Sequence, residues 1–193
     1  MSKDKLSVRP AVLSDALAIG QVQSEALLEA IGAGLGRIPG ASARMALDVG
    51  SLTSVWQDTL VRPAILGHHV LVADADGRVE GLVVLAPADP VVMDDDDPAG
   101  LDAESGQPRI AFEIQAFDVP SRFASQQHEP RMLAAVTDIA KDAGATEIHM
   151  WVIAGHDKMT NLLSQCGFRA RPLRRVAQVD GGEVAEFLWW ALL

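Results

Sequence analysis

The sequence predicts a mixed α/β fold, and three observations support that class. Runs rich in β-branched residues alternate with longer runs whose apolar residues recur at helical spacing. Two Asp-Gly turns each join a pair of β-rich runs, as in antiparallel hairpins. A helical run also connects the β-rich runs at 110–119 and 147–153 as a crossover. The predicted order is strand, helix, helix, three strands, helix, strand, helix and two strands.

The first part of the chain predicts one strand and two helices. "LSVRPA" (6–11) alternates polar and apolar residues, as a short strand does. Asp15 is a plausible N-cap for a helix that runs to about Ile31. The following stretch, 32–44, contains several glycines and a proline, so we expect a flexible loop there. A second helix is expected over about 48–62, before the next proline.

The middle of the chain predicts a hairpin, a long loop and another strand. The β-rich runs 69–75 and 78–86 flank "DG", which is a strong signal for a tight antiparallel turn. Residues 89–109 contain four consecutive aspartates with prolines and glycines, so they predict a long exposed loop. "IAFEIQAFDV" (110–119) then resumes the strand pattern.

The last third predicts two helices around a strand and a closing hairpin. Apolar residues recur at helical spacing over about 129–143, and Gly144 stands where a C-cap glycine belongs. A strand is expected at 147–153 and a helix at 157–166. Two further β-rich runs around "DGG" form the hairpin over 171–193.

Length and composition predict one folded domain over residues 1–193. The chain is 49% hydrophobic and 22% charged, which is typical of a globular protein with a sizeable core. It shows no internal repeat and no composition break that would mark a domain boundary, apart from the two expected loops.

The charge balance limits the classes of partner. The chain has 16 Lys and Arg against 26 Asp and Glu, which gives a formal net charge of −10. This field repels nucleic acid and anionic membranes at long range. We therefore expect neither partner, and a mild preference for cationic over acidic substrates.

The cysteine count and the N-terminal composition predict a cytoplasmic protein. Cys166 is the single cysteine, so no internal disulfide can form. The first ten residues lack the apolar segment of a secretion signal, and "FLWWALL" is far shorter than the roughly 20 residues of a spanning helix. The adjacent His68 and His69 have no third ligand at metal spacing, so no metal site is expected.

The most specific local pattern lies near the end of the chain. "WVIAGHDKMTNLLSQCGF" (151–168) reads as the end of a strand, a helix and a terminal Gly-Phe pair. With the element order and "FEI" at 112–114, it resembles the GNAT superfamily of acyl-CoA-dependent N-acyltransferases over nearly the whole chain. The resemblance implies a mixed, mostly antiparallel central sheet with helices on both faces. It also implies acetyl-CoA or another acyl-CoA as donor, a small-molecule or peptide amine as acceptor, and a homodimer formed through the C-terminal strands.

The resemblance also implies site residues at matching positions. "FEI" is similar to the stretch that carries a general-base glutamate in several GNAT enzymes, so Glu113 is the candidate base. His156 replaces an asparagine that often opens the helix after 147–153, and it is the second catalytic candidate. The alternatives are a solvent-facing or salt-bridged glutamate and a histidine that only caps a helix. The residues expected to contact the donor are Phe117, Val119, Arg122, Gln126, Gln127, His128 and Arg131.

The chain departs from the GNAT pattern where the donor's diphosphate would be held. The family signature there is Gln/Arg-x-x-Gly-x-Gly/Ala, and this chain has Ala124, Gln127 and Glu129 at the three positions. Pro130 has no N–H to donate, and the tyrosine that often serves as general acid is replaced by Leu163. The sequence therefore leaves two alternatives to an enzyme: a GNAT-like module that has lost CoA binding, and one that binds CoA without turnover.

Overall fold

The computed structural model describes residues 6–62, 65–92, 101 and 106–193. In chain order its elements are β1 (Leu6–Pro10), a 3₁₀ helix (Leu13–Asp15), α1 (Ala16–Leu35), α2 (Ala41–Ala46), α3 (Val49–Val61), β2 (His69–Ala75), β3 (Arg78–Ala88), β4 (Ala111–Asp118), a 3₁₀ helix (Ser121–Gln126), α4 (His128–Asp142), β5 (Glu147–Ile153), α5 (Asp157–Gln165), β6 (Arg169–Val179) and β7 (Gly182–Leu192). This order confirms the predicted succession of strands and helices, with α2 added between two predicted helices.

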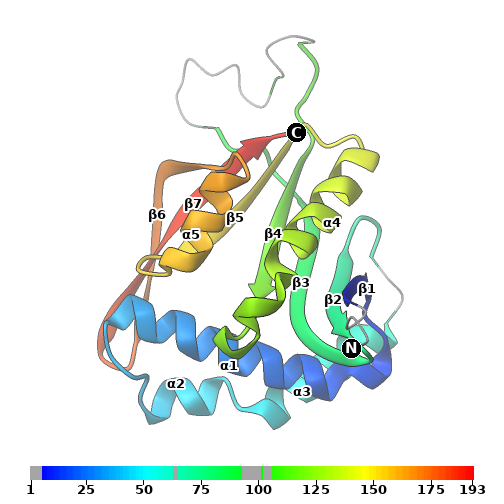
Figure 1. The fold of residues 1–193 in the computed structure, drawn as a ribbon. Coiled ribbons are helices and arrows are strands. Elements are labelled where there is room, and N and C mark those ends of the chain that lie inside the picture. The colour runs from blue at the N-terminus through cyan, green and yellow to red at the C-terminus, as the bar shows by residue number, and fades with distance from the viewer. Residues whose placement is uncertain (1–5, 63–64, 93–100, 102–105) are drawn as a thin grey trace.

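The strands form a seven-stranded sheet in the order β1-β2-β3-β4-β5-β7-β6 (Figure 1). Strands β4 and β5 pair in parallel, and the other neighbouring pairs are antiparallel. A parallel pair needs a crossover, and α4 supplies it. The mixed, mostly antiparallel sheet predicted from the resemblance is therefore confirmed.

Helices cover both faces of this sheet. Met132 and Leu133 of α4 and Leu163 of α5 are fully buried in a core cluster with apolar residues of β2 to β5. On the other face, Ile19 of α1 and Trp56 of α3 form a second cluster with residues of β2 and β3. Figure 1 shows α4 and α5 in front of the sheet, with α1 and α3 crossing it at the lower end. This arrangement confirms the predicted placement of helices on both faces.

The loop predicted at 32–44 is wrong over most of its length. Helix α1 continues to Leu35 and ends at Gly36, whose φ of 63° is a left-handed C-cap, and α2 follows a few residues later. Gly34 lies within α1, close to the sheet. A Cβ atom at this position would stand 2.7 Å from the Ile153 Cγ2 atom of β5, which is too close for any other residue type unless the neighbour shifts. The glycine therefore allows close helix–sheet packing instead of ending the helix.

The predicted loop at 89–109 is described only at its two ends. Residues 93–100, with the four aspartates, and 102–105 lie outside the described residues. At the described ends, Leu101 forms an isolated antiparallel bridge with Pro108. Among the helices of the described part, none is long and apolar enough to cross a membrane.

Candidate functional site

Strands β4 and β5 pair only at their first halves. Their parallel ladder contains four residue pairs, and the last of these joins Ile114 to Met150. Beyond it β4 runs on to Asp118 and β5 to Ile153, with no pairing between the two strands. The two strands thus diverge in the middle of the sheet.

A bulge in β4 gives the divergence a physical cause. Opposite β3, Leu85 pairs with Ile114 while the next residue, Val84, pairs with Ala116, so Gln115 is an extra residue. A bulge of this kind bends its strand and increases the local twist. It stands immediately after the last β4–β5 pair, where the bend turns β4 away from β5.

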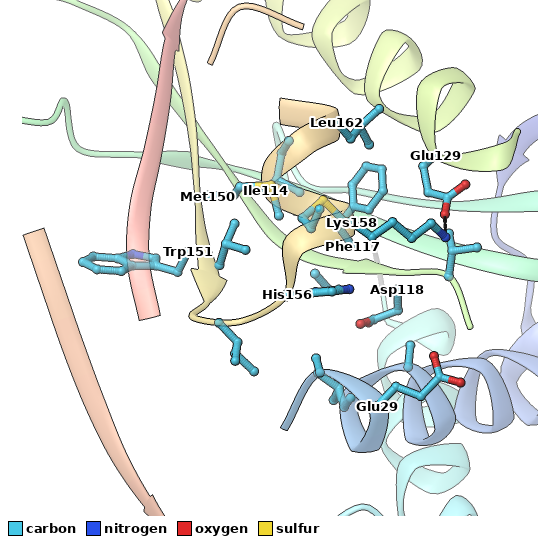
Figure 2. A pocket seen from close by; sticks show the side chains of 18 of the residues that line it. Glu29, Ile114, Phe117, Asp118, Glu129, Met150, Trp151, His156, Lys158 and Leu162 are labelled. Atoms are coloured by element: carbon cyan, nitrogen blue, oxygen red, sulfur yellow. Dashed lines mark ion pairs between the residues drawn. The ribbon is translucent and has the colours of Figure 1, made fainter. Parts of the chain in front are cut away.

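The space between the diverging strands is a cavity of about 480 Å³. Its walls come from α1, β4, the first turn of α4, β5, α5, β6 and β7. Apolar side chains from β4, β5 and α5 line it, among them Phe117, Met150 and Leu162 (Figure 2). Met159 of α5 also lines it. Such a channel suits a slender, largely apolar ligand with a few polar groups along its length.

The structure brings five of the predicted site residues together at this cavity. Glu113, Phe117 and Val119 line it from β4 and the residue that follows. Gln127 and His156 line it from the starts of α4 and α5. Two helix starts, far apart in the sequence, thus border the same cavity.

Three of the predicted donor-binding residues do not line the cavity. Arg122 forms an ion pair with Glu25 of α1. His128 is fully buried, with its Nε2 atom 2.9 Å from a carboxylate oxygen of Glu80 in β3. Arg131 donates to a backbone carbonyl one turn earlier at 3.0 Å. Each of these three side chains therefore has a partner within the protein, and its role toward a donor stays a prediction.

The start of α4 has an irregular backbone. Gln127 precedes the helix with a φ of 55°, which is a left-handed conformation that few residues other than glycine adopt. Pro130 lies in the first turn, where its missing N–H removes one of the donors that a helix start offers to an anion. The backbone of Gln126 lies in the preceding 3₁₀ helix, but its side chain is outside the described part, so the prediction on it stays a prediction.

An ion pair spans this end of the cavity. Glu129, in the first turn of α4, contacts the ammonium group of Lys158, in the first turn of α5 (Figure 2). Both residues line the cavity. The glutamate side chain is 7% exposed and the lysine side chain 47%. Sequence reasoning found Glu129 as a departure from the family pattern and missed Lys158, although a lysine in the first turn of a predicted helix was a visible signal.

Asp118 is a second residue that sequence reasoning missed. Asp118 is 6% exposed, and its Oδ2 atom accepts a hydrogen bond from Gln23 Nε2 at 3.3 Å. Trp56 Nε1 donates to Gln23 Oε1 at 2.8 Å, which directs the amide nitrogen toward Asp118. Burial raises the pKa of the Asp118 carboxyl to about 7, against a smaller opposite effect of the hydrogen bond from Gln23. The cavity therefore has a carboxyl that titrates near neutral pH.

The two catalytic candidates differ in their surroundings. The Glu113 side chain is 27% exposed, and its Oε2 atom lies 3.8 Å from His149 Nε2 on β5. Burial lowers the pKa of His156, and the positive charge of Lys158 lowers it further, against smaller opposite effects of nearby carboxylates. At neutral pH the imidazole of His156 is therefore mainly uncharged, so it offers one donor and one acceptor nitrogen.

Solved structures similar to this chain identify its fold, whereas its sequence has no significant match among family models or curated proteins. The ribosomal-protein-alanine N-acetyltransferase from Brucella melitensis superposes with a TM-score of 0.65 at 18% identity, covering 97% of this chain and 99% of that chain. A GCN5-related N-acetyltransferase from Rhodopseudomonas palustris superposes with a TM-score of 0.66 at 14% identity, and the match covers 100% of this chain and 99% of that chain.

This chain has the GNAT fold. A third structure with this fold, the PaiA N-acetyltransferase from Thermoplasma acidophilum, contains coenzyme A. It superposes with a TM-score of 0.59 at 16% identity, and 98% of this chain and 99% of that chain are covered. The GNAT fold predicted from the sequence is therefore confirmed along nearly the whole chain.

Proposed function

We propose that this protein is an acyl-CoA-dependent N-acyltransferase whose donor enters the cleft between β4 and β5. The observation that carries the proposal is the end of the β4–β5 ladder at Ile114 and Met150, beyond which a cavity with both apolar and charged walls lies inside a GNAT-fold sheet. A cleft filled by side chains at this position would instead have favoured a purely structural role.

The residues around the cavity fit the arm of an acyl-CoA. Phe117, Met150 and Leu162 offer apolar walls for a slender chain, and beyond Ile114 and Met150 the facing edges of β4 and β5 are not paired with each other. The donor supplies a thioester, whose acyl carbonyl is open to attack by an amine. The protein's contribution is to hold amine and thioester together at the correct distance.

The charge distribution suggests how the donor is oriented. Lys158 is the cation at the α4 end of the cavity, and this end suits the anionic part of the donor. The thioester then lies toward the narrow end, where Glu113 borders the last paired residues. We propose that Glu113 takes the ammonium proton of the acceptor, directly or through water. We propose that His156, uncharged near neutral pH, holds the donor by a hydrogen bond.

The acceptor in this proposal is a small-molecule or peptide amine. Glu29 lines the same cavity from α1, where its carboxylate accepts from Ser121, and Glu186 lines it from β7, paired with Arg175 of β6. The net charge of −10 attracts cations at long range. An ammonium group therefore enters a more favourable field than a carboxylate would.

Two measurements test the proposal. Calorimetry should show acetyl-CoA binding below hundreds of micromolar, and a thiol-release assay over a panel of amines should show turnover. Glu113→Gln should lower kcat about 10²- to 10⁴-fold, since that is the usual contribution of a positioned base. Glu183→Gln, which removes the same charge from an exposed ion pair, is the matched control and should leave kcat unchanged.

A second candidate function is an interaction module that has lost its donor. It is favoured by the Glu129–Lys158 ion pair inside the cavity and by Leu163, which is fully buried at the position of the family's acidic tyrosine. Absence of any heat with acetyl-CoA at hundreds of micromolar, together with no thiol release, would support this module and contradict the enzyme. Binding without thiol release would identify a module that holds CoA without turnover.

A further inference from the structure

Lys158 places a positive charge at the α4 end of the cavity. A cavity that bound only an apolar chain would not need this charge. Lys158 extends along the opening from α5, and its ammonium group meets Glu129 (Figure 2). The two arginines nearer in sequence to the start of α4 are engaged elsewhere. Arg122 pairs with Glu25, and Arg131 donates to a backbone carbonyl. Neither lines the cavity, whereas Lys158 does.

Glu129 is placed where an anion would otherwise be bound. It lies in the first turn of α4, where the positive end of the helix dipole favours negative charge. Its carboxylate is almost fully buried at the cavity wall, and Lys158 gives it an opposite charge. The Glu129 carboxylate is thus an anion at the start of a helix with a cation beside it. A bound phosphate group would be stabilised by the same two features.

We propose that Lys158 is an anion-binding residue of the cleft, that it takes the diphosphate of the donor, and that Glu129 occupies this place in the free protein. The inference rests on the proposed donor. Binding exchanges one partner of Lys158 for another, so the ammonium group stays paired throughout. The exchange needs no glycine loop, because a flexible side chain from α5 provides the charge that backbone N–H groups would provide elsewhere.

The test uses calorimetry with two ligands, of which only one contains the diphosphate. Acetyl-CoA contains the diphosphate and the 3′-phosphoadenosine attached to it, and acetyl-pantetheine contains neither. Glu129→Gln removes the internal anion, so acetyl-CoA should bind about tenfold tighter than to the wild type, or about 1.4 kcal/mol. Lys158→Met should weaken acetyl-CoA binding at least about tenfold. Lys158→Arg keeps the charge and should bind within about threefold of the wild type. Acetyl-pantetheine should bind all four proteins about equally.

Controls separate this inference from folding defects and from the donor proposal. Thermal unfolding checks that each variant is folded, and Glu183→Gln makes the same change in net charge at the exposed β6–β7 hairpin. Acetyl-CoA binding that Glu129→Gln and Lys158→Met leave unchanged would overturn the inference while leaving the donor proposal intact. Failure of both ligands with every protein would overturn both. Binding by Glu129→Gln alone would support the inference, since Glu129 would then be what excludes the donor from the wild type.

Discussion

At the scale of single residues, Asp118 is the carboxyl whose environment changes its chemistry most clearly. Burial beside the cavity raises its pKa to about 7, while an unfolded chain would leave it near the ordinary value of 3.8. The folded protein therefore keeps a proton that the unfolded chain releases between these two values. Because the unfolded state binds fewer protons there, the free energy of unfolding should fall as the pH rises from about 4 to about 7.

Asp118→Asn should remove this dependence. The interval between the two pKa values corresponds to at most roughly 4 kcal/mol, so the variant should be more stable than the wild type at pH 8 and similar to it at pH 4. Gln23 can still donate to the asparagine oxygen. Urea unfolding at both pH values measures the effect, and Asp58→Asn, exposed on α3, is the control for charge. Equal destabilisation of Asp118→Asn at both pH values would show that the carboxyl does not titrate as the structure implies.

At the scale of elements, the path of α1 depends on the absence of a side chain at Gly34. A Cβ there would stand 2.7 Å from Ile153 Cγ2 and 3.2 Å from Val184 Cγ1. Both neighbours belong to strands beneath the helix, β5 and β7. The glycine thus sets how closely α1 approaches the side of the sheet that contains the cleft.

Gly34→Ala should destabilise the protein by about 1 to 3 kcal/mol through overpacking, reduced by up to about 1 kcal/mol from better helix propensity. Ile153→Ala removes the atom that the new Cβ would meet. The double variant should therefore lose less unfolding free energy than the sum of the losses in the two single variants. A double-mutant cycle measured by urea unfolding gives this difference. Additive effects would show that the contact between α1 and β5 is not the cause.

At the scale of the whole molecule, a buried ion pair connects the long segment after β3 to the sheet. The Arg109 side chain is 8% exposed and the Glu147 side chain 0% exposed. The Arg109 Nη1 atom lies 3.2 Å from the Glu147 Oε2 atom. The same glutamate accepts from the N–H of Val91 at 2.7 Å, and Arg109 donates to the carbonyl of Val91 at 3.1 Å. Both ends of the segment are therefore attached to the start of β5.

Glu147→Gln should be destabilising, by about 1.5 to 3 kcal/mol, because a neutral amide replaces the buried carboxylate that contacts Arg109 and accepts from the N–H of Val91. Glu183→Gln breaks the exposed Arg174–Glu183 pair and should change the free energy of unfolding by less than about 1 kcal/mol. Chemical denaturation of the two variants compares buried with exposed pairing directly. Similar small effects in both would mean that the segment is not held by this pair.

Much of the fold could be predicted because the signals are local. The Asp-Gly turns, the alternating runs and the C-cap glycine after α4 depend on residues a few positions apart, and the structure confirms the elements they predict. The glycines at 32–44 could not be interpreted in the same way. A cluster of glycines by itself predicts the end of a helix. At Gly34, however, glycine is required because strands more than a hundred residues later in the sequence lie too close for a side chain. The β4 bulge at Gln115 was likewise invisible, because it depends on the register with β3.

The candidate site was predictable in part. Glu113, Phe117, Val119, Gln127 and His156 line one cavity, and their roles stay proposals. By itself, the sequence determined the order of elements and the unusual residues at the start of α4, because both are written in local patterns. Only the tertiary structure decided that β4 and β5 diverge and that Lys158, not a nearby arginine, meets Glu129. The reason is that a cleft and an ion pair depend on distances between segments far apart in the chain.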